Sequence, residues 1–301
     1  MTARAIETVD QFKLTVLIEN SPAYDTYLEG CFGLSLWIEM WKDGKRRNVL
    51  FDVGPRADTL ARNAASLGID LSSVDAIVLS HCHFDHTAAL SGFLKSLLRP
   101  VPVFGHPDLF RPNFVLLPEF MDYAMSGENS RVNLENAGAA FVLTRDSIEP
   151  FPGFVLTGEV EHVTPFEETG GVSCLTTDEA GNLVPDRLQD DVSAVVNVRD
   201  VGAVVLSGCG HAGIVNIVKK AKALAGDTGI TAIIGGFHLL QATLERTEWT
   251  IAAFKEIAPD LEVIAPMHCT GLQPSAMMAA SFGEAFKELH VGDRVVFPTV
   301  R

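Results

Sequence analysis

Four imidazole or carboxylate side chains fall within six consecutive residues: His81, His83, Asp85 and His86. In an extended segment His81 and His83 project to the same side and can hold one cation, whereas Asp85 and His86 follow a change of direction and can face a second. Imidazole and carboxylate suit zinc, and also iron or manganese. Two such cations about 3.5–4 Å apart would share a water molecule and turn it into a nucleophile at neutral pH. The alternative is a histidine-rich surface loop without function, because a motif match alone is a hypothesis.

The elements on either side of this motif predict where it lies in the fold. The apolar run at 76–79 is short and partly β-branched, which predicts a buried strand. Residues 87–98 are predicted to form a helix, because their leucines and Phe93 share one face and Pro100 lies beyond its end. The ligands are therefore expected on a tight loop between a strand and a helix, at the sheet edge where open α/β proteins bind ligands.

Three later apolar runs are also followed by histidine. The runs at 202–206, 230–234 and 261–265 precede His211, His238 and His268, and a run ending in Asp52 precedes the motif. If these strands have the same orientation in their sheets, their ends converge on one edge. One such histidine could arise by chance, but four indicate a common cause, which we infer to be a metal centre.

Six side chains are predicted to bind two cations, three at each position. We assign them as His81, His83 and His211 for one cation, and Asp85, His86 and His268 for the other. For His211 and His268 the alternative is a capping or core histidine.

Other polar residues near these strand ends leave alternatives open. Cys209 could place a thiolate on a metal, or could be a small buried residue. Asp191 or Asp190, before the predicted strand at 194–198, could contribute a carboxylate, and the sequence does not separate the two. Asp52 is expected to orient a ligand or a water molecule rather than to bind directly.

Two residues are predicted to be catalytic, Asp85 and His238. His238 is the candidate for contacting the substrate or delivering a proton, since the two cations already have enough ligands. Its alternative role is that of a structural, hydrogen-bonding histidine.

The remaining elements are predicted from periodicity and turn residues. Asp43-Gly44 predicts a hairpin between strands at 34–41 and 48–52. Between about 100 and 190, prolines break up short apolar runs, which predicts an irregular elaboration that could cover the metal site or could be an insertion without function. Further elements are predicted as a strand at 12–18, paired strands at 194–198 and 202–206, and helices at 57–66, 212–224 and 244–257.

Composition limits the classes of partner. The 301 residues are enough for one large domain or two small ones, and the net charge of −15 disfavours nucleic acid. The five cysteines are an odd number without framework spacing, which indicates a reducing compartment. No signal-peptide pattern and no run long enough to span a membrane are found, so we expect a cytoplasmic protein without a membrane partner.

Several motifs resemble those of a known family. The sequence His-Cys-His-Phe-Asp-His at 81–86, Asp52 after a strand and the strand-end histidines resemble the metallo-β-lactamase-fold superfamily. The stretches at 207–216, 235–239 and 268–271 are similar to its dihydropterin–ribofuranosylaminobenzene phosphate synthase-like subgroup. The resemblance is weakest between residues 100 and 190. It implies one α/β domain over residues 1–301, a four-layer αββα sandwich with a dinuclear metal site at one edge.

Two positions depart from the family pattern. Cys209 follows Gly208 where many members have a bridging aspartate, so the bridging ligand stays open between Cys209, Asp190 and Asp191. His162 stands where the subgroup usually has arginine, which weakens the inference that a phosphorylated substrate binds in the same way.

Three functions are compatible with these residues. The leading hypothesis is a hydrolase in which hydroxide activated by two divalent cations, zinc before manganese or iron, attacks an ester, lactone or phosphoester in a small molecule. The second is a synthase-like transferase, in which the metals hold a diphosphate leaving group, and the third is a non-catalytic metal- or ligand-sensing module. An iron redox role is disfavoured, since His83 stands where di-iron relatives carry a carboxylate. A homo-oligomer is compatible with the sequence.

Overall fold

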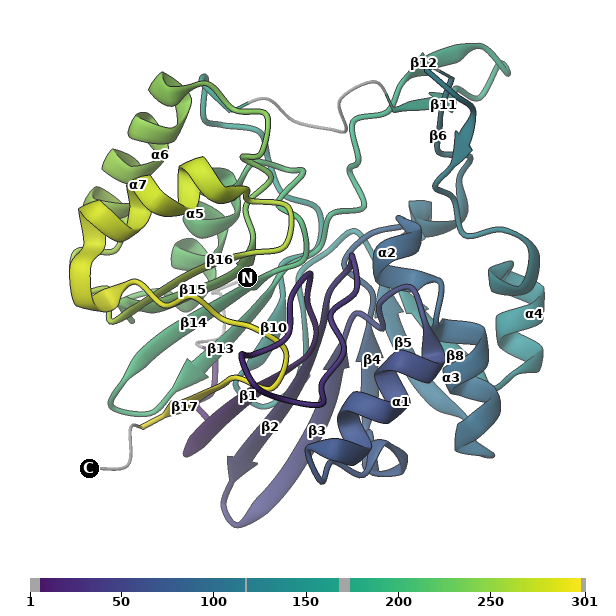
Figure 1. The fold of residues 1–301 in the computed structure, drawn as a ribbon, viewed down its shortest axis with the longest axis horizontal. Coiled ribbons are helices and arrows are strands. Elements are labelled where there is room, and N and C mark those ends of the chain that lie inside the picture. The colour runs from purple at the N-terminus through teal and green to yellow at the C-terminus, as the bar shows by residue number, and fades with distance from the viewer. Residues whose placement is uncertain (1–5, 117, 168–173, 299–301) are drawn as a thin grey trace.

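Two β-sheets face each other, and helices cover the outer face of each sheet (Figure 1). The layers therefore follow the order helix, sheet, sheet, helix, which is the αββα sandwich expected from the sequence. The computed structural model describes residues 6–116, 118–167 and 174–298, so that parts of the predicted elaboration, 117 and 168–173, lie outside the described residues.

The first sheet has seven strands in the order β17-β1-β2-β3-β4-β5-β8. They are β1 (Gln11–Ile18), β2 (Ser35–Lys42), β3 (Lys45–Phe51), β4 (Ala76–Val78), β5 (Val101–Gly105), β8 (Ala139–Leu143) and β17 (Arg294–Phe297). The helices on its outer side are α1 (Ala57–Ser66), α2 (Phe84–Thr87), α3 (Leu90–Leu97) and α4 (Arg131–Asn136).

The second sheet has six strands in the order β16-β15-β14-β13-β10-β9. They are β9 (Ile148–Phe151), β10 (Phe154–Leu156), β13 (Ala194–Val198), β14 (Gly202–Ser207), β15 (Ile230–Gly236) and β16 (Val263–Met267). Its outer helices are α5 (Ile214–Ala225), α6 (Leu244–Ile257) and α7 (Leu272–Phe282).

A third, four-stranded sheet has the order β12-β11-β6-β7 and stands apart from the two large sheets (Figure 1). Its strands are β6 (Phe114–Val115), β7 (Met121–Asp122), β11 (Leu175–Thr177) and β12 (Leu183–Pro185). Short 3-10 helices complete the elements: η1 (Leu71–Ser73), η2 (Pro107–Phe110), η3 (Gly127–Asn129) and η4 (Gly283–Ala285). The predicted elaboration is thus divided, because β5, β8, β9 and β10 belong to the two large sheets and the other strands to this small one.

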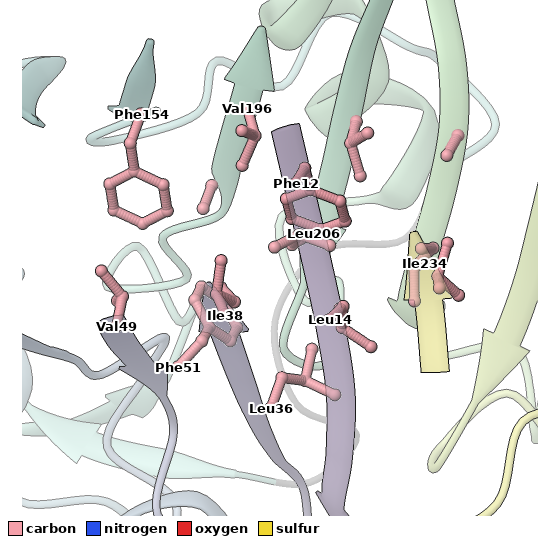
Figure 2. Packing of buried hydrophobic residues seen from close by; sticks show 14 of the residues in the cluster. Phe12, Leu14, Leu36, Ile38, Val49, Phe51, Phe154, Val196, Leu206 and Ile234 are labelled. Atoms are coloured by element: carbon pink, nitrogen blue, oxygen red, sulfur yellow. The ribbon is translucent and has the colours of Figure 1, made fainter. Parts of the chain in front are cut away.

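The apolar core lies between the two large sheets. Phe12 and Phe51 of the first sheet and Phe154 and Leu206 of the second point into the same layer and are fully buried (Figure 2). Separate apolar clusters attach α1, α3 and α4 to the first sheet and α5 and α6 to the second. Strands covered on both faces read as continuous apolar runs, which is why β4, β14 and β15 could be found in the sequence.

Strand direction brings the predicted site together. β3 and β4 are parallel neighbours, as are β14, β15 and β16. The carboxyl ends of neighbouring parallel strands lie at the same edge of a sheet, so the residues after these strands converge. The predicted hairpin is confirmed as β2–β3, with both Asp43 and Gly44 at positive φ, and the predicted pairing of 194–198 with 202–206 is confirmed as β13–β14.

The prediction of one helix at 87–98 is wrong about where the helical structure begins. The chain forms the short helix α2 first, so Asp85 and His86 lie on helix α2 and not on a loop. The helix then breaks because Ala89 N donates to Gly54 O instead of continuing the helical pattern, while Asp85 O and His86 O accept from Leu34 N and Val53 N. These neighbouring strand ends therefore hold the two residues in place.

None of the helices in the described ranges combines the length and apolarity needed to cross a lipid bilayer. All five cysteines are free.

Candidate metal centre

Side chains from both large sheets meet at the edge where β4, β14 and β16 end. Two groups of three have their ligand atoms within 4.8 Å of one another: His81, Cys209 and His211, and His86, Cys209 and His268. Cys209 belongs to both groups, and all five residues are buried. His86 and His268, whose Nε2 atoms are 3.2 Å apart, are separated by 182 positions in the chain.

The other two predicted ligands lie beside these groups. The ring centroid of His83 is 4.6 Å from that of His81 and 4.9 Å from that of His211. Asp85 Oδ2 lies 3.1 Å from His268 Nε2 and 3.5 Å from His86 Nε2. The structure therefore brings together both sets of three that were assigned from the sequence.

The donor atoms fit divalent cations. Nε2 of His81 and Nε2 of His83 are buried, and no described residue provides them with a hydrogen-bond partner. A buried polar atom without a partner costs about 1–3 kcal/mol, which a bound cation would offset. Imidazole, carboxylate and thiolate together suit zinc or iron better than magnesium or calcium.

Asp52 supports two of these histidines from behind. Its Oδ2 lies 2.7 Å from His86 Nδ1 and accepts a hydrogen bond from Ser80 Oγ, which lies 2.9 Å from His81 Nδ1. Its Oδ1 accepts from Ser80 N. With the Nδ1 atoms held in this way, the Nε2 atoms of both histidines point into the centre, the arrangement by which carboxylates orient metal-binding histidines. Gly208 packs here without a side chain, since a Cβ would lie 2.2 Å from Ser80 Oγ.

The histidines differ in their protonation. Burial lowers the pKa of His83 to about 4, and burial with neighbouring imidazoles lowers the pKa of His81 well below its usual value. Burial opposes protonation of His86 as well, but the carboxylates of Asp85 and Asp52 outweigh it and raise the pKa of His86 to about 9. His81 and His83 are thus neutral, with lone pairs available to a cation.

His268 is held by two residues that the sequence interpretation missed. Glu19 Oε1 accepts a hydrogen bond from His268 N, while Asn20 Nδ2 donates to His268 O and Asn20 Oδ1 lies 3.2 Å from His268 Nδ1. Both polar residues directly follow the buried strand β1, which is the same strand-end signal that identified the histidines.

The two candidate carboxylates, Asp190 and Asp191, have different positions. Asp190 Oδ2 accepts from Cys82 N, between His81 and His83, and its Oδ1 is paired with Arg111 at 2.8 Å. Asp191 Oδ2 accepts from Ala212 N, next to His211, and burial raises its pKa to about 7. Neither belongs to the two groups that share Cys209. Metal binding by Asp191 therefore stays a prediction.

His238 lies beside the centre, with its ring centroid 4.2 Å from that of His211. Burial lowers its pKa to about 4, so its imidazole is neutral. His238, Asp52 and His268 all have positive φ, between 46° and 56°. Non-glycine residues adopt this conformation rarely, and it is concentrated where the chain must aim a side chain at a functional site.

A cavity of about 700 Å³ opens over the centre. His83, Asp85, Cys209, His211 and His268 lie at its floor, together with His238. Its wall includes residues of the small sheet, of helix α2 and of the loops: Phe32, Phe84, Val115, Met121, Tyr123, Cys174 and Leu240. Apart from Phe84, these wall residues could not be predicted from the sequence, because they come from short segments without periodicity.

Comparisons with known proteins agree with this fold. The sequence model of the metallo-β-lactamase superfamily matches residues 28–268. The 7,8-dihydropterin-6-methyl-4-(β-D-ribofuranosyl)-aminobenzene-5′-phosphate synthase of Methanocaldococcus jannaschii is 35% identical, over 97% of this chain and 99% of that protein. The crystal structure of Tm1679, described as a metal-dependent hydrolase of the β-lactamase superfamily, has a TM-score of 0.76 at 23% identity, over 94% of this chain and 98% of that one. Human tRNase Z, short form, has a TM-score of 0.51 at 12% identity, over 95% of this chain and 100% of that one.

Proposed function

The chain belongs to the metallo-β-lactamase superfamily, and on that premise we propose that it is a metal-dependent hydrolase of an ester, lactone or phosphoester bond in a small molecule. The observation that carries this proposal is the pair of ligand groups that share Cys209. A cytoplasmic location and a homo-oligomeric state stay predictions.

His81, His83 and His211 would hold one cation, and Asp85, His86 and His268 the other, with Cys209 between them in place of a bridging carboxylate. Two bound cations would act as Lewis acids and lower the pKa of a water molecule to near neutrality. Zinc is the first candidate, because a thiolate favours it over manganese.

The protein's own residues would orient and enclose the substrate. Asp52 keeps the Nε2 atoms of His86 and His81 directed at the centre, and Asn20 and Glu19 do the same for His268. His238 would donate or accept a hydrogen bond at the reacting group, since its neutral ring lines the cavity beside His211. The apolar wall would exclude bulk water from the bond that is broken.

A transferase of the synthase type is the second candidate function. It is favoured by the 35% identity to the archaeal synthase along nearly the whole of both chains. Assays with ester, lactone and phosphodiester panels separate the two, because a hydrolase would cleave a member of one panel whereas a transferase with a carbon nucleophile would cleave none.

The first test is metal content per chain, measured by plasma mass spectrometry on protein purified without chelator or metal-affinity tag. We expect about two equivalents in the wild type and a sharp fall in His83→Ala. His290→Ala is the matched control, because His290 lies outside both ligand groups, and should keep the full content. No bound metal, even after zinc or manganese is supplied, would contradict the proposal.

A further inference from the structure

The cavity over the metal centre has a mainly apolar wall. Its wall carries three aromatic rings, Phe32, Phe84 and Tyr123, together with Met121 and Leu240. The polar side chains among the other described lining residues are Gln241 and Asn20, and Asn20 already holds His268. A pocket of this kind gains affinity by removing apolar ligand surface from water.

The aromatic rings flank both parts of the floor. The ring of Tyr123 lies 5.3 Å from that of His83 and stacks on Phe84, with centroids 5.6 Å apart and planes 13° from parallel. On the side of the second ligand set, Phe32 lies 5.1 Å from His268. Phe32 and Tyr123 are only partly buried, so part of each ring is open to a ligand. A planar group entering the cavity would therefore meet a ring beside either set of ligands.

Lysine and arginine are absent from the described lining, whereas Asp85 contributes a negative charge. Residues 168–173, outside the described part of the chain, contain neither Lys nor Arg in the sequence. Arg246 contributes to lowering the pKa of His238, but its side chain is buried and does not line the cavity. Arg145 and Lys220 line a separate hollow.

A phosphate group remote from the reacting bond would therefore find no guanidinium or ammonium partner. Phosphate recognition in proteins depends mainly on such cations, and the net charge of −15 adds long-range repulsion. The helix α7 begins after Gly271 on the lining, so it offers an anion backbone amides alone.

We infer that the substrate carries an uncharged planar aromatic group next to the bond that reacts, and no phosphate on that group. The inference deepens the proposed function and rests on it, because the reacting group must lie on the metal floor. Within the predicted substrate classes, it selects esters, lactones or phosphoesters whose group next to the reacting bond is an uncharged aromatic ring.

Binding of three small hydroxamic acids tests the inference without turnover. Hydroxamates chelate divalent metals, so acetohydroxamic, benzohydroxamic and 4-phosphonobenzohydroxamic acid share one anchor and differ only in the group that meets the wall. Calorimetric titration of metal-loaded wild-type protein should give benzohydroxamate an affinity about tenfold above acetohydroxamate. The phosphonate should bind about tenfold more weakly than benzohydroxamate.

Variants of the wall identify the residues responsible. Tyr123→Leu should reduce the ratio of benzohydroxamate to acetohydroxamate affinity to about threefold, while Tyr123→Phe should retain it. Tyr27→Leu is the matched control, because Tyr27 is fully exposed and does not line the cavity. Met121→Lys should raise the affinity for the phosphonate about tenfold by adding the missing cation.

Two results would overturn the inference while leaving the proposed function intact. One is equal affinity for acetohydroxamate and benzohydroxamate, and the other is a phosphonate that binds wild-type protein as tightly as benzohydroxamate. Protein that binds no metal, and hence no hydroxamate, would overturn the proposed function and this inference together.

Discussion

Asp52 and Tyr123 each touch a residue of the predicted metal centre, but they are held in different ways. Asp52 is fully buried, and both of its carboxylate oxygens have partners at 2.7 Å. Tyr123 follows the two-residue strand β7 and meets His83 and Phe84 only through ring contacts. Asp52 is thus joined to the cavity floor by directional hydrogen bonds, whereas Tyr123 of the wall meets the floor by non-directional packing.

The floor and the wall therefore have different roles. Hydrogen bonds at the ends of two large sheets keep the predicted ligands of the floor at fixed distances, which metal chemistry requires. The wall is attached through a small sheet in which β6 and β7 share only two residue pairs, so its residues can change without disturbing the floor. We expect the floor to determine the reaction and the wall to determine the substrate.

Breaking the link between wall and floor should have the largest effect. Arg111 pairs with Asp186 at 2.7 Å, where the small sheet ends, and with Asp190, which holds Cys82 N in the floor. Arg111→Met would leave two buried carboxylates without their cation. We expect it to lower the free energy of unfolding by about 3–5 kcal/mol, measured by urea denaturation.

Arg131→Met provides the control for Arg111, because Arg131 pairs with Glu135 on the exposed face of α4, where an ion pair contributes little. Adding Asp190→Asn to Arg111→Met should recover part of the loss by removing one uncompensated charge. Equal stability of Arg111→Met and Arg131→Met would show that the link does not couple wall and floor.

A buried carboxyl group at the beginning of α5 has a pKa near neutral pH. Glu167 accepts hydrogen bonds from Val215 N and Asn216 N at the beginning of α5. Burial raises the pKa of Glu167 to about 7, although these two hydrogen bonds and the positive charges of Arg246 and Lys219 act to lower it. A carboxyl group whose pKa is raised on folding contributes stability below its unfolded pKa, and this contribution is lost as the pH rises through the folded pKa.

Glu167→Gln should therefore remove this pH-dependent contribution to the free energy of unfolding. Between pH 5 and pH 8, wild-type stability should fall by about 2–3 kcal/mol relative to this variant, as measured by denaturation at both pH values. Glu161→Gln, at an exposed position nearby in the chain, should show the same dependence of stability on pH as the wild type. If the difference in the free energy of unfolding between wild type and Glu167→Gln is the same at pH 5 and pH 8, the pKa of Glu167 lies outside this range.

A change within the floor should have the smallest expected effect. Asp52→Asn keeps the shape of the side chain but weakens its hold on His86, and loss of such a supporting carboxylate costs about 10- to 100-fold in metal affinity. Competition with a chromophoric chelator measures this loss, and Asp58→Asn on the exposed face of α1 should show none. Unchanged affinity in Asp52→Asn would mean that the floor does not depend on this hydrogen bond.

The difference between the cavity floor and its wall also determines which residues could be predicted from the sequence. His81, His83, Asp85 and His86 follow a buried strand within one short segment, so local pattern was sufficient to group them. Cys209, His211 and His268 were found because parallel strands end at a common edge. The layer order of the fold came from the resemblance of these motifs to a known family.

Tyr123 and Arg111 could not be found in this way. Their positions depend on pairing between segments that are distant in the chain, such as Leu175 with Phe114, and two-residue strands leave no periodic signal. The break between α2 and α3 was missed for a related reason, because Gly54 O competes for Ala89 N only once the chain has folded.

The division of the floor between the two sheets has a consequence for how the protein would acquire the proposed cations. Contacts between residues far apart in sequence close large loops and form late in folding, and His86 and His268 are 182 positions apart. The complete ligand set exists only after the two sheets have docked on their shared apolar core. We therefore expect the chain to fold before it takes up its cations, so that metal supply in the cell limits the active fraction of the protein and not its folding.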